Sequence, residues 1–205
     1  MTRAGRPRRF ESEDELKILF DAALVVMARN GYQDAAVAEI LDEANLSTRS
    51  FYRHFGSKDQ LLCAIYRREA ESAAERLRAK VDAADTPLDA LDAWIEEILS
   101  FGHHRTKAAR AAVLGSPGAM KAEGYAEETR HGAKLLIAPL EDLLAAGARD
   151  GTFPAADPAD APLIQSVVWT AAGLNPMRDK PISRAEALSQ VRSFCLRALG
   201  VSASD

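Results

Sequence analysis

Two short helical patterns separated by a tight turn occupy residues 35–62, and they constrain the fold more than any other stretch. The stretch reads AAVAEILDEANLSTRSFYRHFGSKDQLL. Its first apolar residues have the i, i+3, i+4, i+7 spacing of one helix face: Val37, Ile40, Leu41 and Ala44. Asn45 follows, and asparagine tolerates the left-handed backbone conformation in which many helices end. The pattern predicts a short helix that stops at Asn45.

A second short helix is predicted to begin after Ser47, a favourable N-cap residue. Leu46 precedes the cap and is expected to pack on Phe51 as a hydrophobic staple. Phe51 and Phe55 lie one turn apart and anchor the inner face. The outer face then carries long polar side chains, namely Thr48, Arg49, Tyr52 and Arg53. A short helix with these two faces is typical of the recognition helix in a helix-turn-helix.

Residues 31–62, GYQDAAVAEILDEANLSTRSFYRHFGSKDQLL, resemble the DNA-binding region of the TetR family of bacterial transcriptional regulators. The similarity runs from about Leu16 to about Tyr66, and SFYRHFGSKDQLL is its most specific part. It implies an all-α chain with an N-terminal three-helix helix-turn-helix domain and a larger C-terminal helical domain for ligand binding and dimerisation. We expect a basic flexible arm over 1–11, the helix-turn-helix domain over 12–66 and the second domain over 67–205. A generic helix-turn-helix used for protein contacts is the alternative.

The resemblance also implies which residues contact DNA. The base-edge candidates are Thr48, Arg49 and Tyr52, and arginine can donate two hydrogen bonds to guanine in the major groove. The phosphate candidates are Ser50, Tyr52, Arg53, His54 and Lys58. Lys58 lies at a predicted helix N-terminus, which itself favours anions, whereas His54 has a structural role as its alternative. The chain departs from the family pattern at Ala36, where threonine is frequent, and at Asn45, where glycine is common.

The N-terminal residues are basic although the whole chain has a formal net charge of −4. No acidic residue occurs before Glu11, and the candidate DNA-binding arm comprises Arg3, Arg6, Arg8 and Arg9. Such an arm tracks phosphates or enters the minor groove; a solvated tail is the alternative. Ser12 and Glu15 have the spacing of a capping box, which predicts that the first helix begins there.

The remainder of the chain reads as further helices. Ser57–Gln60 begins a long helix to about residue 84, which we expect to carry a conformational change by tilting. Later helices are predicted from Pro87, over 125–148, after Asp157–Pro158, and after Ser183. Pro139 lies inside the second of these, so that helix is either kinked or begins later. The resemblance implies that the last two helices form a homodimer interface; the alternative is that one monomer buries both their faces.

A ligand pocket in the second domain is implied by the resemblance and not by the apolar spacing, which is equally compatible with a packed core. Its candidate lining residues are Trp94, Ile98, Phe101, Met120, Tyr125, Leu136, Leu140 and Trp169. An apolar lining favours a small, largely hydrophobic effector.

Catalytic and metal-binding patterns are not found in the sequence. His103 and His104 are adjacent, so on a helix they point about 100° apart and make a poor metal site. Acidic pairs such as Glu96–Glu97 and Glu127–Glu128 are interpreted as solvated helix faces. We therefore expect no cofactor, no metal and no enzymatic activity. No apolar run reaches the length of a membrane span and no signal peptide is recognised, so a cytoplasmic location without membrane contact is expected.

The resemblance to the TetR family, together with these features, implies a ligand-responsive repressor. As a dimer it is expected to bind a pseudo-palindromic double-stranded DNA operator and to release it when an effector binds. Two alternatives remain from the sequence: a ligand-blind activator or architectural DNA-binding protein, and an enzyme or small-molecule carrier that has retained a helix-turn-helix.

Overall fold

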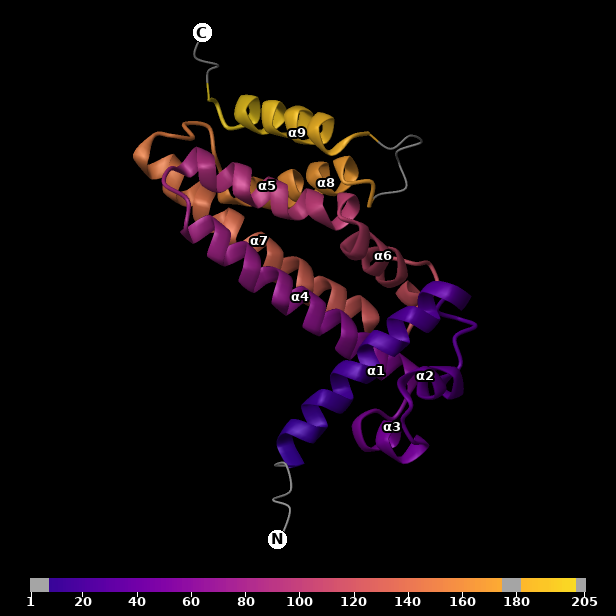
Figure 1. Ribbon diagram of the computed structural model, residues 1–205. Coiled ribbons are helices and arrows are strands. Elements are labelled where there is room, and N and C mark those ends of the chain that lie inside the picture. Colours follow the sequence, from indigo (N-terminus) through magenta and orange to yellow (C-terminus); the bar gives the residue numbers. More distant parts are fainter. Residues whose placement is uncertain (1–7, 175–181, 202–205) are drawn as a thin grey trace. The chain divides into compact units, whose positions relative to one another are not determined.

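The computed structural model describes residues 8–174 and 182–201, with side chains from residue 13 onward (Figure 1). All regular secondary structure in these residues is helical, which confirms the all-α prediction. The chain divides into two compact units. The first comprises the residues up to Tyr66 together with Ala112–Glu128, and the second comprises Arg67–Ala111 and the residues from Thr129 onward. The sequence assigned residues 112–128 to the second domain, but they pack with the first unit.

The first unit begins with α1, which spans Arg8–Asn30. Ser12 therefore lies inside this helix, and the prediction that it caps the helix was wrong. Residues 8–11 likewise belong to α1 and not to a flexible arm; Arg8 and Arg9 lie on its first turn, whereas Arg3 and Arg6 lie outside the described residues. The unit continues with α2 (Val37–Ala44), α3 (Thr48–His54), the start of α4 (Lys58–Asp82), the end of α6 (Arg105–Leu114), the 3-10 helix η1 (Ala119–Lys121) and the start of α7 (Tyr125–Asp150).

Residues 112–128 supply part of the first unit's hydrophobic core. Tyr125 is fully buried there, and its hydroxyl donates a hydrogen bond to the Leu114 carbonyl oxygen at 2.7 Å. Its ring meets Tyr66 edge-on at 5.2 Å between centroids. The same core includes Leu19, Met27, Ile40, Phe51, Leu61 and Ile65 from α1 to α4. This second segment is thus part of the support for the three N-terminal helices.

The second unit contains α5 (Pro87–His103), most of α4 and α7, the 3-10 helix η2 (Pro158–Asp160), α8 (Ala161–Ala171) and α9 (Arg184–Ala198). Thr86 caps α5 by accepting a hydrogen bond from the Asp89 amide at 3.1 Å, with Pro87 in the first helical position as predicted. Helix α7 continues through Pro139, so the alternative that it begins later is wrong. No helix among the described residues has the length and apolar character needed to cross a membrane.

Helix α5 is central to the second unit and packs against both α8 and α9, which also contact each other (Figure 1). Trp94 of α5 is completely buried, and its indole N–H donates to the Leu136 carbonyl oxygen at 3.0 Å. Asp92 of α5 accepts a bifurcated hydrogen bond from the Nε–H group of Arg192 on α9, with 2.9 Å between Nε and each carboxylate oxygen. Apolar burial and this ion pair together hold α9 on α5.

A buried carboxylate, Glu97, was wrongly interpreted from the sequence as solvated. Only 2% of this residue is exposed. It accepts hydrogen bonds of 2.7 Å from Lys80 on α4 and from Lys107 on α6. Burial raises the pKa of a carboxyl group, but here the two lysines outweigh that effect and the pKa of Glu97 is lowered. Glu97 therefore stays ionised and joins three helices.

Close packing of α5 on α8 requires a glycine. A Cβ atom on Gly102 would lie 1.7 Å from the carbonyl oxygen of Ala172, a backbone atom that cannot swing away. We expect Gly102→Ala to lower the free energy of unfolding by about 3 kcal/mol, because the two helices must separate. Urea denaturation followed by circular dichroism measures this. Gly56→Ala is the control: its nearest neighbour is the flexible end of Gln60, so stability should change little, and equal losses in the two variants would contradict the packing argument.

Candidate nucleic-acid interface

Helix α3 is short and takes its orientation from the core beneath it. Phe51 is 1% exposed, and Phe55, which follows the last helical residue, is also buried. Ser47 caps the helix by accepting a hydrogen bond from the Ser50 amide at 3.2 Å, as predicted. The preceding turn contains Asn45 with φ 50° and ψ 44°, so asparagine does adopt the left-handed conformation expected of it. The inner face is thereby fixed at both ends of the helix.

The base-edge candidates lie on the solvent-exposed part of α3. Thr48, Arg49 and Tyr52 are all exposed. The Tyr52 ring stands edge-on to Phe51, with centroids 5.2 Å apart and an interplanar angle of 87°. Because Phe51 is buried, this contact limits the orientations that the Tyr52 ring can adopt. The three side chains form one polar surface that is accessible to a partner.

The phosphate candidates are more varied in their surroundings. Ser50 is half-buried and its hydroxyl accepts a hydrogen bond from Arg53 at 3.2 Å. Arg53 is exposed but also donates to Oε2 of Glu15 on α1 at 2.6 Å. The His54 side chain is largely buried, with its Nε2 atom 3.6 Å from the same carboxylate oxygen. Its position therefore favours the structural alternative for His54 over a phosphate contact.

Lys58 also differs from its expected role. Its ammonium group donates to the carbonyl oxygens of Tyr32, Gln33 and Ala35 at 2.7, 2.9 and 2.9 Å. An ammonium has three N–H donors, so these bonds use all of them. The nitrogen also lies 4.7 Å from the centre of the Tyr32 ring. In this structure Lys58 holds the loop between α1 and α2 and has no N–H donor left for a phosphate.

Asp59, the next residue, connects three parts of the first unit. It accepts a hydrogen bond from the Tyr32 hydroxyl through Oδ1 and one from the Glu123 amide through Oδ2, the latter at 2.8 Å. These bonds lower the pKa of the Asp59 carboxyl group, while burial and the neighbouring carboxylate raise the pKa of Tyr32. Asp59 is thus charged at neutral pH. The hydrogen bond to Glu123 could not be predicted from residue types because Glu123 takes part through its backbone.

The expected ligand-pocket residues are not brought together as one set. Tyr125 is buried in the core of the first unit, and Met120, on η1 in the same unit, is largely exposed. Trp94, Ile98, Leu136 and Leu140 are buried in the core of the second unit. Phe101 and Trp169 are only partly buried and form a tilted ring pair with centroids 6.2 Å apart. An apolar stripe from sequence could not distinguish these four environments.

Residues 19–65 match the family model described as bacterial regulatory proteins, tetR family. This segment contains α2, α3 and the turn between them, the elements that present the polar surface described above. Over residues 19–65 the chain is therefore similar to the TetR family of bacterial regulatory proteins.

Individual TetR-family relatives agree with this assignment. The HTH-type transcriptional regulator BetI of Brucella canis is 34% identical over 77 residues, which cover 38% of this chain and 39% of BetI. The match thus spans well under half of the relative's own length.

Similarity of fold to solved structures covers most of the chain. FadR from Bacillus subtilis in complex with stearoyl-CoA superposes with a TM-score of 0.74 at 18% identity, covering 89% of this chain and 98% of FadR. FadR from Bacillus halodurans gives 0.75 at 17%, covering 95% and 97%.

The revised role of Lys58 leads to a stability prediction. Lys58→Met should lower the free energy of unfolding by about 1–3 kcal/mol, because three backbone carbonyl groups lose their charged donor. Thermal denaturation measures the loss. Lys17→Met, which removes an exposed lysine from α1 of the same unit, serves as the control and should leave the melting temperature nearly unchanged. A Lys58 variant as stable as the control would show that the loop does not need its ammonium group.

Proposed function

We propose that this chain is a TetR-family DNA-binding transcriptional regulator of the cytoplasm, and that it acts as a ligand-responsive repressor. The observation that carries the proposal is the exposed face of α3. Its anchor Phe51 is buried, whereas Thr48, Arg49 and Tyr52 are exposed to solvent. A helix held this way can enter the major groove and read base edges. The arm residues Arg3 and Arg6 add sequence-independent affinity in this proposal.

Arg49 is the residue whose replacement tests base reading. Arg49→Ala should weaken binding to the preferred duplex, selected from a random pool, by about 1–3 kcal/mol and should relax the preference at one base position. Gel shifts with the selected duplex and with its single-base variants measure both effects. Lys17→Ala removes one exposed positive charge from α1 and controls for charge alone. If Arg49→Ala retains full affinity and full base preference, the assignment of α3 as the reading helix is wrong.

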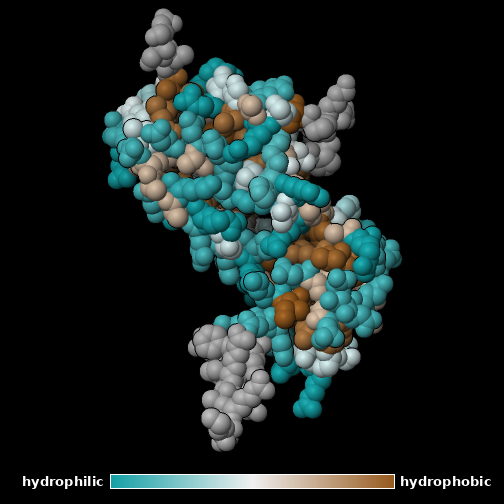
Figure 2. All heavy atoms as spheres, viewed as in Figure 1, coloured by the Kyte–Doolittle hydropathy of each residue, from teal (hydrophilic) through white to brown (hydrophobic). Residues whose placement is uncertain are grey.

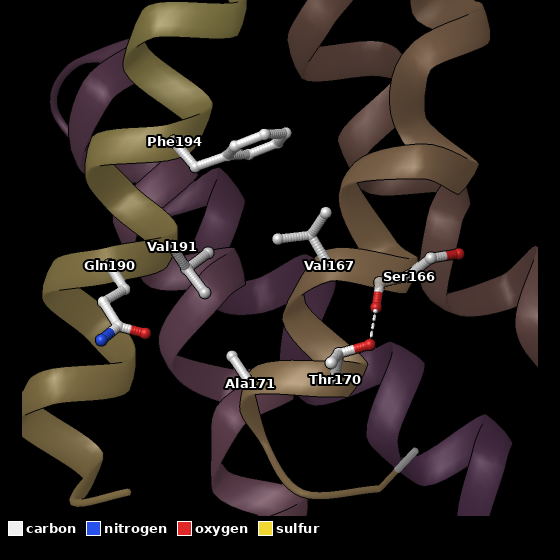
Figure 3. A pocket seen from close by; sticks show the side chains of 7 residues that line it. All are labelled: Ser166, Val167, Thr170, Ala171, Gln190, Val191 and Phe194. Atoms are coloured by element: carbon white, nitrogen blue, oxygen red, sulfur yellow. Dashed lines mark hydrogen bonds between the residues drawn. The ribbon is translucent and has the colours of Figure 1, made fainter. Parts of the chain in front are cut away.

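Dimerisation through α8 and α9 is the second part of the proposal. A groove of about 510 Å³ lies between these helices, and Figure 3 shows Val167 and Phe194 on its two sides. Its polar lining includes Thr170, whose hydroxyl already donates to the Ser166 carbonyl oxygen at 2.9 Å. Leu163 on α8 and Phe194 on α9 are large apolar residues that remain exposed. To bind an operator, a dimer that covers them must present its two α3 helices to successive major grooves, about 34–36 Å apart.

The dimer proposal makes a specific prediction. The double substitution Leu163→Glu and Phe194→Glu should shift the protein to a monomer in light scattering and should weaken operator binding, because charges would be buried against the second copy. Val25→Glu is the matched control. Val25 is an exposed apolar residue on the first unit, where Figure 2 shows other apolar side chains at the surface. If the double variant remains a dimer while Val25→Glu becomes a monomer, the interface lies elsewhere.

Release by an effector is the third part of the proposal. Support comes from FadR of Bacillus subtilis, which shares the fold and was solved with stearoyl-CoA. For release, the effector must bind the conformer with the wrong α3 spacing more tightly than the DNA-bound one. Helix α4 connects the two units in sequence and would transmit the change by tilting.

A further inference from the structure

The surroundings of Glu97 contain more positive charge than the carboxylate neutralises. We call Arg76, Lys80, Glu97, Ser100 and Lys107 the Glu97 cluster. Lys80 and Lys107 each contact one carboxylate oxygen at 2.7 Å, and Nε of Arg76 lies 3.6 Å from Oε1. Three cations thus face one anion, in a chain whose total formal charge is −4. Within this cluster the positive charges exceed the negative charge by two, so a second anion would be attracted to it.

The positive groups are also the accessible part of the cluster. The side chain of Glu97 is 3% exposed, whereas those of Lys107, Arg76 and Lys80 are 29%, 44% and 51% exposed. The carboxylate therefore lies behind its cations. Lys80 gives one of its three N–H groups to Glu97, and Arg76 donates to the Ser72 hydroxyl at 2.7 Å through Nη1. An anion approaching from solvent meets donors first.

A buried donor or acceptor without a partner lies one turn further along α5. Ser100 accepts a hydrogen bond from Lys107 at 2.7 Å. His103, three residues on and therefore adjacent on the helix surface, has a buried Nε2 atom with no hydrogen-bond partner. A buried polar atom left unpaired costs free energy, and a bound polar group removes that cost.

Aromatic surface adjoins the positive charge. The Lys107 ammonium lies 5.5 Å from the centre of the Phe101 ring. Phe101 in turn packs against Trp169 at an interplanar angle of 39°, and both rings are partly buried. All of these residues belong to the second unit. A ligand that used the cations and the rings together would need a charged end next to an apolar body.

We propose that the Glu97 cluster and the Phe101–Trp169 pair bind an amphipathic organic anion, with its carboxylate or phosphate on Arg76, Lys80 and Lys107. The inference rests on the proposed effector response and names the chemical class of that effector. The incoming anion competes with Glu97 for the two lysines. Because Lys80 and Arg76 belong to α4 and Glu97 to α5, this competition weakens a connection between those helices.

The test compares probes of equal length and different charge. Isothermal titration calorimetry of the full chain with octanoate, octyl phosphate and 1-octanol should show both anions binding at least about tenfold more tightly than the alcohol. The ratio of the two anions distinguishes a carboxylate from a phosphate effector. Equal affinity for octanoate and 1-octanol, or binding of neither anion, would overturn the proposal.

Two substitutions with opposite effects separate a binding site from a purely structural ion pair. Arg76→Gln should weaken octanoate binding about tenfold without changing 1-octanol binding, whereas Glu97→Gln should strengthen octanoate binding because the competing anion is gone. Lys134→Gln removes an exposed lysine on α7, outside the cluster, and should change neither octanoate nor 1-octanol binding. Unchanged octanoate affinity in Arg76→Gln, whose half-exposed side chain can be removed without unfolding the chain, contradicts the assignment.

Operator binding by the wild-type protein, measured in the same preparation, keeps the two proposals apart. Intact operator binding with no preference for anions overturns only the choice of effector. If the wild-type protein does not bind an operator, the regulator proposal itself is overturned.

Discussion

Burial of Phe51 is the interaction on which the candidate DNA-reading surface depends. A helix of seven residues is too short to be stable by itself in water, so its position must come from tertiary contacts. The Phe51 ring supplies that contact from within α3, and Phe55 supplies it just after the helix ends. Tyr52 leans edge-on against Phe51, so the same anchor also orients a residue of the outer face. Thr48 and Arg49 are presented by a helix whose orientation they do not determine.

Charged side chains near α3 stabilise its supports and do not all face outward. Lys58 binds the three carbonyl groups of the α1–α2 loop, and Asp59 connects Tyr32 to the backbone at Glu123. Glu15 on α1 holds Arg53. A recognition surface with several basic residues in sequence therefore offers fewer cations to a phosphate backbone than the sequence suggests.

Structural features that depend on residues close together in the chain were predicted correctly from the sequence. The Ser47 cap, the left-handed Asn45 and the apolar positions of α2 and α3 all depend on residues within one or two turns of each other. Side-chain roles were predicted wrongly where the hydrogen-bond or ion-pair partner lies far away in the sequence. Glu97 was interpreted as solvated because Lys80 lies 17 residues away on another helix, and Lys58 reaches carbonyl groups 23 to 26 residues earlier. The Ser12–Glu15 spacing resembled a cap, but Glu15 takes Arg53 as its partner and the helix begins at Arg8.

The contribution of residues 112–128 to the first unit has a consequence for how such chains are built. A fragment that stops after Tyr66 lacks Val113, Ala119 and Tyr125, so buried faces of α1 and α4 would meet water. The N-terminal helices and the internal segment 112–128 thus form one packing unit although they are far apart in the sequence. A chimaera joined at a single junction after Tyr66 would therefore bury these faces of α1 and α4 only if its second part carried a segment that matches residues 112–128.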